Sequence, residues 1–145
     1  MELKTCTFFG HRDTPQSVKP LLQTVLCDLI EQGVDRFYVG NQGNFDAMAA
    51  ALLKELEQSR GIRFEIVLAY LPKERDPFFE THSILPEGIE NVPQRFAIEY
   101  RNKWMIDHSD IVITYVRRSF GGAAKFKTLA TKKNKTVIEL SEQKS

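Results

Sequence analysis

The stretch TCTFFGHRDTPQSVKPLLQTVLCDLIEQGVDRFYVG, residues 5–40, decides the fold class. It begins with a short apolar run of strand-forming residues, TCTFF at 5–9, and ends with another, RFYVG at 36–40. Between the two runs, apolar residues recur at helical spacing across 18–30, and Gly33 follows as a helix stop. A strand, a helix and a strand in this order predict two parallel strands joined by a crossover helix.

The same alternation continues through the rest of the chain. Helical patterns cover 44–60, 95–108 and the segment after the glycine pair at 121–122. Three further apolar runs read as strands, namely RFEIVLAY (63–70), IVITYV (111–116) and KTVIEL (135–140). We therefore predict one α/β domain over residues 1–145, a Rossmann-like three-layer unit with a mainly parallel five-stranded sheet and helices on both faces.

Residues 71–94, LPKERDPFFETHSILPEGIENVPQ, show neither helical nor strand periodicity. Structureless segments of this length are uncommon in compact domains and are usually functional or mobile. We expect a long surface loop or lid, which Phe78 and Phe79 either pack down or present to a ligand or a partner subunit.

Composition excludes several classes of function. The chain has 20 Lys+Arg and 19 Asp+Glu, and a net charge of +1 gives no general attraction to nucleic acid or to a membrane. No apolar stretch approaches the roughly 18 residues of a membrane span, and the first residues lack the apolar core of a signal peptide. Neither the two cysteines nor the three histidines have metal-site spacing. We expect a cytoplasmic protein without metal or cofactor, and a homodimer is possible.

Glycine and polar residues follow three of the predicted strands. Loops after parallel strands emerge at one edge of a sheet, where glycine, arginine and helix N-termini together suit a phosphate. Each loop alone could be an ordinary turn, but their convergence favours a ligand site. The candidates are Gly10, His11 and Arg12 after the first strand, then Gly40, Asn41, Gln42, Gly43, Asn44 and Asp46 after the second, and Arg117, Arg118, Ser119, Gly121 and Gly122 after the fourth.

Three motifs resemble a known family: FFGHR (8–12), VGNQGNFDAMAAALLKEL (39–56) and YRNKWMIDHSDIVITYV with the following GGAAKFKTLATKKNKTVIEL. They look like the SLOG superfamily of Rossmann-like domains. That superfamily joins the DNA-processing proteins of bacterial transformation to the Lonely Guy (LOG, lysine decarboxylase-like) nucleotide phosphoribohydrolases. They resemble in particular a small bacterial branch with a GHR first loop and a GxxGxD second loop, and the resemblance covers nearly the whole chain outside 71–94.

The resemblance implies a nucleotide pocket but not the LOG reaction. LOG enzymes cleave an N-glycosidic bond with the arginine of RKxxM and the glutamate of PGGxGTxxE. Here RNKWM keeps Arg101, whereas Thr128 stands where the glutamate is expected. Arg101 and Asp46 remain as weak catalytic candidates, since Asp46 could substitute for the carboxylate or bind a ribose hydroxyl, or could simply complement a helix dipole.

Three functions stay open on the sequence. The first is a protein that binds or senses a nucleotide or nucleotide derivative through its phosphate, which we expect not to be an enzyme. The second is a LOG-type nucleoside-monophosphate N-glycosidase or a (deoxy)ribosyltransferase-like enzyme. The third is single-stranded DNA binding, for which the lysine-rich stretch 123–135 is a candidate surface, although the net charge of +1 disfavours it.

Overall fold

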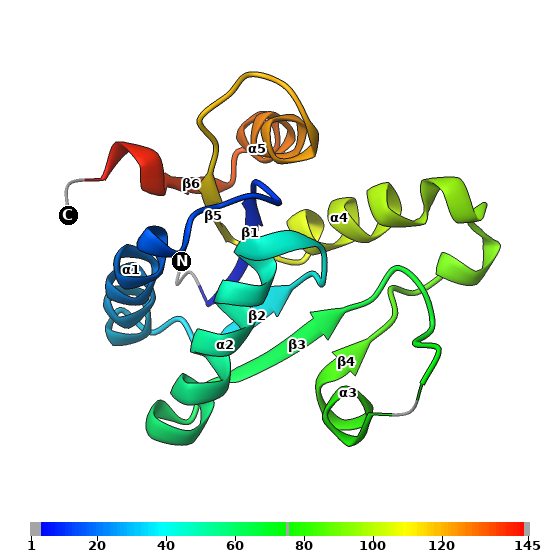
Figure 1. Cartoon of the computed structure of the whole chain (residues 1–145), viewed down its shortest axis with the longest axis horizontal. Coiled ribbons are helices and arrows are strands. Elements are labelled where there is room, and N and C mark those ends of the chain that lie inside the picture. The colour runs from blue at the N-terminus through cyan, green and yellow to red at the C-terminus, as the bar shows by residue number, and fades with distance from the viewer. Residues whose placement is uncertain (1–3, 75, 144–145) are drawn as a thin grey trace.

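Six parallel strands form the centre of the molecule in the computed structural model, which describes residues 4–74 and 76–143 (Figure 1). Their order in the sheet is β4-β3-β2-β1-β5-β6. Every neighbouring pair runs parallel, so the predicted α/β class with a Rossmann-like sheet is confirmed. The strands are β1 (Thr5–Gly10), β2 (Arg36–Val39), β3 (Arg63–Val67), β4 (Ser83–Ile84), β5 (Ile111–Tyr115) and β6 (Thr136–Glu139).

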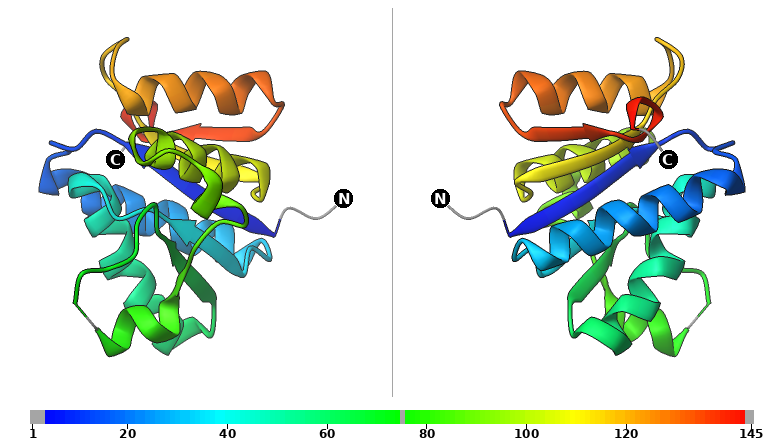
Figure 2. Two further views of the ribbon diagram at one scale, coloured as in Figure 1. Left: turned by 90° about the vertical axis from the view of Figure 1, so that its right-hand side faces the viewer. Right: turned by 90° about the vertical axis from the view of Figure 1, so that its left-hand side faces the viewer.

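Helices cover both faces of the sheet, as the two views of Figure 2 show. Side chains alternate between the faces of a strand, so Phe8 of β1 enters one core and Phe9 enters the other. The first core contains the apolar stripes of α1 (Lys19–Glu31) and α2 (Gly43–Arg60). The second core contains those of α4 (Ala97–Asp107) and α5 (Gly122–Lys132), which completes the three layers.

The segment 71–94 is not the structureless loop that its sequence predicts. It contains the helix α3 (Pro77–His82), the strand β4 and a short 3-10 helix, η2 (Ile89–Asn91), while residue 75 lies outside the described residues. Two residues of pairing are enough to make β4 the sixth strand, and so short a strand leaves no detectable period in the sequence. The five-strand prediction is therefore wrong by one edge strand.

Helix α3 is held against the scaffold on the side of α2. Phe78 packs on Phe64 of β3, with ring centroids 6.1 Å apart, and the ammonium of Lys54 lies 4.2 Å from the Phe78 ring centroid. The imidazole Nε2 of His82 lies 2.9 Å from a carboxylate oxygen of Glu57. Phe78 and Phe79 thus pack the segment down, as expected, and the surface they contact is that of the first core.

The strand order places a topological switch point at β1. The chain builds β1, β2, β3 and β4 outward in one direction and then returns to add β5 and β6 on the other side of β1. Loops that leave β1 and β5 at their carboxyl ends therefore diverge, and a crevice opens between them. No helix among residues 4–74 and 76–143 is long and apolar enough to span a membrane.

Candidate functional site

A cleft of about 340 Å³ lies at this switch point. The loops that follow β1 and β5, the start of α2 and the inward face of α4 form its walls, and the first turn of α5 closes one side. Its size falls within the range of small-molecule sites. The lining residues are Phe8, Phe9, Gly10, His11, Arg12, Asp13, Gln42, Asp46, Ile98, Arg101, Asn102, Met105, Arg118, Gly121, Gly122, Ala123 and Phe126.

The structure brings most of the predicted residues to this cleft. The loops after β1 and β5 and the start of α2 meet there, as the parallel sheet requires. Six predicted residues do not line it: Gly40, Asn41, Gly43, Asn44, Arg117 and Ser119. The predicted residues that line the cleft are Gly10, His11, Arg12, Gln42, Asp46, Arg101, Arg118, Gly121 and Gly122.

Three of the predicted phosphate-loop glycines lie close against neighbouring groups of the protein. A Cβ at Gly10 would lie 2.2 Å from Cγ of Phe45. A Cβ at Gly43, where φ is +87°, would lie 2.7 Å from Cα of Arg12. At Gly40 it would lie 2.8 Å from Oδ2 of Asp46. Gly10 and Gly43 let the loop after β1 approach the start of α2, and Gly40 leaves room for Asp46 and Arg101. That these glycines also bring the backbone to a ligand stays a prediction.

Gly121 and Gly122, at the start of α5, have no such packing role. A Cβ at either position would meet nothing within 4 Å. Gly121 has φ of +93° and so favours glycine for its conformation, whereas Gly122 already belongs to the helix. The first N–H groups of a helix have no intrahelical acceptor, and no side chain caps α5. The N-terminus of α5 therefore faces the cleft with open backbone donors.

His11 joins two of the loops. Its Nε2 accepts the backbone N–H of Arg117 at 2.9 Å, which places the ring proton on Nδ1. The side chain is buried, and burial lowers the pKa of His11, with the nearby charge of Arg118 acting in the same direction. His11 thus ties the loop after β1 to the loop after β5. Because its Nε2 already accepts this hydrogen bond, that nitrogen cannot also take a proton from a ligand.

Arg101 forms part of the cleft floor and is only 1% exposed. Its Nη1 donates to the carbonyl oxygen of Val67 at 2.9 Å and to Oδ1 of Asn41 at 3.2 Å. Its Nε donates to Oδ1 of Asn102 at 2.7 Å. Burial lowers the pKa of Arg101, and the charge of Asp46 opposes that shift. Most donors of this guanidinium are thus occupied by the protein itself.

Asp46 lies beside Arg101, and the missing Cβ of Gly40 leaves room for both. Its Oδ2 accepts the backbone N–H of Gln42 at 2.9 Å, which fixes the carboxylate at the start of α2. Burial raises the pKa of Asp46 to about 6, while the Gln42 N–H and the charge of Arg101 oppose the shift. A carboxyl group in a cleft with such a pKa can exchange a proton near neutral pH, which is a property of catalytic acids.

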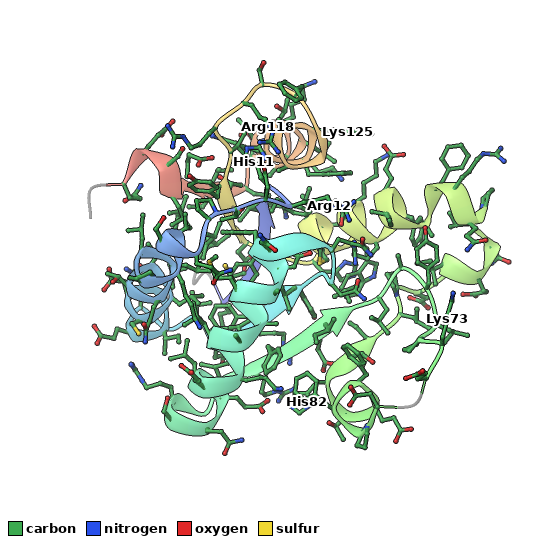
Figure 3. All side chains as sticks on the ribbon, in the orientation of Figure 1. His11, Arg12, Lys73, His82, Arg118 and Lys125 are labelled. Atoms are coloured by element: carbon green, nitrogen blue, oxygen red, sulfur yellow. The ribbon has the colours of Figure 1, made fainter. Side chains whose placement is uncertain are left out.

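Arg12 and Arg118 stand at the mouth of the cleft, as Figure 3 shows around the upper end of β1. The exposed guanidinium of Arg12 has no hydrogen-bond or ion-pair partner within 4–74 and 76–143. The Nη2 of Arg118 lies 3.0 Å from Oδ1 of Asp13, and this hydrogen bond lowers the pKa of Asp13. The mouth thus carries one cation that is free and one that is paired.

One wall of the cleft, on the side of α4 and α5, is apolar, and the sequence did not predict it as part of the site. Phe9 and Phe126 stack with ring centroids 5.5 Å apart, and Met105 packs in the same core. Their apolar periodicity marks them only as core residues, because nothing in a sequence distinguishes a core side chain at a cleft from one elsewhere. The other residues missed are Phe8, Asp13, Ile98, Asn102 and Ala123.

The position of the LOG glutamate lies outside the cleft. Thr128 lines a separate groove between α4 and α5, together with Glu99 and Lys103. Glu139 is not a substitute, because it is buried and accepts hydrogen bonds from Thr114, Val116, Ser141 and Lys127. The carboxylates that line the cleft are Asp13 and Asp46.

The lysine-rich segment 123–135 is largely neutralised. Lys125 pairs with Glu99, Lys127 with Glu139 and Lys133 with Asp107. Paired lysines contribute less counterion release on contact with a nucleic-acid backbone. In the described part of the chain, no three His, Cys, Asp or Glu side chains gather as a metal site would require.

Comparison with known proteins supports the fold. No protein-family model matches the chain, and no curated protein matches it either. Among solved structures, the chain is similar to DNA processing protein A (DprA) from Streptococcus pneumoniae, with a TM-score of 0.71 and 15% identity. The match covers 93% of this chain and 49% of the DprA chain, so this chain corresponds to about half of that protein. At this identity the comparison shows a shared α/β fold, and nothing more follows about activity.

Proposed function

We propose that the protein binds a nucleotide or a nucleotide derivative, with the phosphate at the N-terminus of α5. The observation that carries this proposal is the pair Gly121 and Gly122, which leave open backbone donors at the switch-point cleft. Helix N-termini attract anions through free N–H groups and the helix dipole. The SLOG resemblance of the sequence supports the same class of ligand.

The cleft has separate regions for the parts of a nucleotide. Arg12 and Arg118 stand beside the α5 terminus and supply positive charge for the phosphate. Ile98, Met105 and Phe126 form an apolar surface for the base. The partly buried carboxylate of Asp46 can accept a hydrogen bond from a ribose hydroxyl. This division into an anionic end, a polar floor and an apolar wall fits a nucleotide better than a bare anion.

Replacing Gly122 with alanine tests this arrangement. The added methyl group meets nothing within 4 Å, and alanine favours a helix over glycine, so the melting temperature should stay the same or rise slightly. The methyl group would, however, separate a phosphate from the first turn of α5. We expect the unmodified protein to bind the 5′-mononucleotides AMP, GMP, CMP and UMP. In Gly122→Ala their affinity should fall about tenfold or more, which corresponds to about 1.4 kcal/mol per decade.

Ser119→Ala serves as the control, since it changes an exposed side chain of the same loop without narrowing the cleft. Calorimetric binding isotherms and melting curves should be recorded on the three proteins. Unchanged affinity in Gly122→Ala would contradict a phosphate at this terminus. Failure of all four mononucleotides to bind the unmodified protein would contradict the proposed ligand class.

A second candidate function, N-glycosidic cleavage of a nucleoside monophosphate, has one specific observation in its favour. Asp46 places a carboxyl group with a pKa of about 6 in the cleft beside Arg101, although the LOG glutamate is absent. A general acid works best with a pKa near the operating pH. Asp46 and Arg101 would then occupy the roles of the LOG carboxylate and arginine.

We expect no release of free base from mononucleotides, because the amide of Gln42 and the loop contacts hold Asp46 at the start of α2 as a binding group. Chromatographic assay for adenine after incubation with AMP checks this. Turnover on the order of 1 per second or faster would favour the enzyme. In that case Asp46→Asn should lower the rate of base release by about a hundredfold or more. The rate of the unmodified protein should then depend on pH, with a change near pH 6.

A further inference from the structure

An ion pair crosses the mouth of the cleft between two of its loops. Arg118, after β5, donates from Nη2 to Oδ1 of Asp13 at 3.0 Å and from Nη1 to Oδ2 at 3.4 Å. Asp13 belongs to the loop after β1. Both side chains remain solvent-accessible, with 40% of Arg118 and 71% of Asp13 exposed. The two-pronged geometry is the one that a guanidinium also forms with a phosphate.

The loop that carries Arg118 is fixed at its base and exposed at its tip. The N–H of Val116 is held by Glu139 at 2.9 Å, and that of Arg117 is held by His11 at 2.9 Å. All five residues from 117 to 121 are exposed, and Phe120 is 70% exposed. Arg118 can therefore change its partner by side-chain rotation, while the loop that positions it stays in place.

We propose that Asp13 occupies the guanidinium of Arg118 in place of the ligand's phosphate, so that binding transfers Arg118 from Asp13 to the ligand. Asp13 then lowers the affinity of the cleft for anions of the phosphate type. This inference rests on the proposed function, since it concerns the anionic end of the same cleft. It predicts that removal of the Asp13 charge increases affinity, whereas loss of a ligand-contacting residue decreases it.

The charges around the mouth explain why a competing carboxylate is placed there. Arg12 and Arg118 line the cleft, and Arg117, the residue before Arg118, is exposed. Buried Arg101 lies at the floor. Neutral His11 contributes no charge, and the carboxylate of Glu139 is already occupied by Lys127 and Ser141. Asp13 is thus the acidic group at the cleft mouth, and Asp46 lies at the floor.

Exposed ion pairs stabilise a protein only weakly, so an arriving anion can displace the carboxylate. Release of that competitor should raise affinity by about two- to fivefold, the range that single exposed pairs reach. The gain should shrink as salt is added, because salt weakens the interactions of solvent-exposed ion pairs. The arrangement therefore predicts a small increase in affinity when the Asp13 charge is removed, and a smaller increase at high salt.

The test compares Asp13→Asn with Asp107→Asn, using inorganic pyrophosphate as the probe. Asp107 is also an exposed aspartate paired with a cation, Lys133, but it lies at the end of α4 outside the cleft. Both substitutions raise the net charge by one and keep the side-chain shape. We expect Asp13→Asn to tighten pyrophosphate binding by about two- to fivefold and Asp107→Asn to leave it unchanged.

Arg118→Ala completes the cycle. If Arg118 is the group that Asp13 withholds, Asp13→Asn should give no gain in the Arg118→Ala background. Equal or weaker pyrophosphate binding in Asp13→Asn, or a gain equal to that of Asp107→Asn, would overturn this inference while leaving the nucleotide site standing. Absence of both pyrophosphate and mononucleotide binding to the unmodified protein would instead overturn the proposed function and this inference with it.

Discussion

Replacement of Arg101 by methionine should lower the free energy of unfolding by about 3–5 kcal/mol. The side chain is 1% exposed, and its loss would leave the carbonyl of Val67 and the carboxylate of Asp46 without their buried cation. Methionine fills similar space, so the cost comes mainly from the polar groups left behind. Urea unfolding followed by circular dichroism measures the effect.

Arg12→Met is the matched control, because it removes an arginine from the same cleft. Arg12 is exposed and has no side-chain partner among the residues the structure describes, so its replacement should change stability by no more than about 0.5 kcal/mol. Its effect should appear in nucleotide affinity instead. Equal stability of the two variants would show that Arg101 is not the structural cation of the cleft floor.

Glu139→Gln is expected to cost about 2–3 kcal/mol of stability. The buried carboxylate accepts the Thr114 hydroxyl at 2.7 Å, the Val116 N–H at 2.9 Å and the Lys127 ammonium at 2.8 Å. An amide presents an NH₂ group to donors that need an acceptor, so some of these bonds are lost. Because Val116 begins the loop after β5, the cleft mouth should also become more mobile.

The pH dependence of stability identifies the same group. Burial alone would raise the pKa of Glu139, but the hydrogen bonds from Lys127, Val116, Ser141 and Thr114 outweigh it and lower the pKa to about 2. The folded protein therefore gains stability from Glu139 above its ordinary pKa of 4.5 and loses that gain as the pH falls toward 2. Between pH 5 and 2, the unmodified protein should lose more stability than Glu139→Gln. Parallel curves for the two proteins would contradict this assignment.

The sequence predicts the fold well because its signals are local and repeated. Apolar runs followed by helical stripes indicate parallel strands without knowledge of their order. The switch point at β1 cannot be predicted this way, because it depends on where β5 pairs, and that pairing joins residues far apart in the chain. The strand β4 escapes for a different reason, since two paired residues carry too little pattern to detect.

The sequence predicts which loops come together at the cleft but not what each residue there contacts. Glycine at a strand end has the same appearance whether a ligand or a neighbouring loop lies against it. Only the contacts separate Gly10, which faces the Phe45 ring, from Gly122, which faces open space. Arg101 shows the same limit, because an arginine on a helix reveals neither its burial nor its partners.

One measurement tests the central claim most directly: titration of the ¹⁵N-labelled protein with AMP, followed by amide NMR. A phosphate at the N-terminus of α5 should shift the amides of 121–123 most strongly, together with those of 11–13 and 42, while α3 and β4 remain unchanged. Figure 3 shows why these regions can be separated, since His82 lies well away from Arg118 and Arg12. Shifts confined to the α3 and β4 segment, or no shift at millimolar AMP, would contradict a nucleotide site at this cleft.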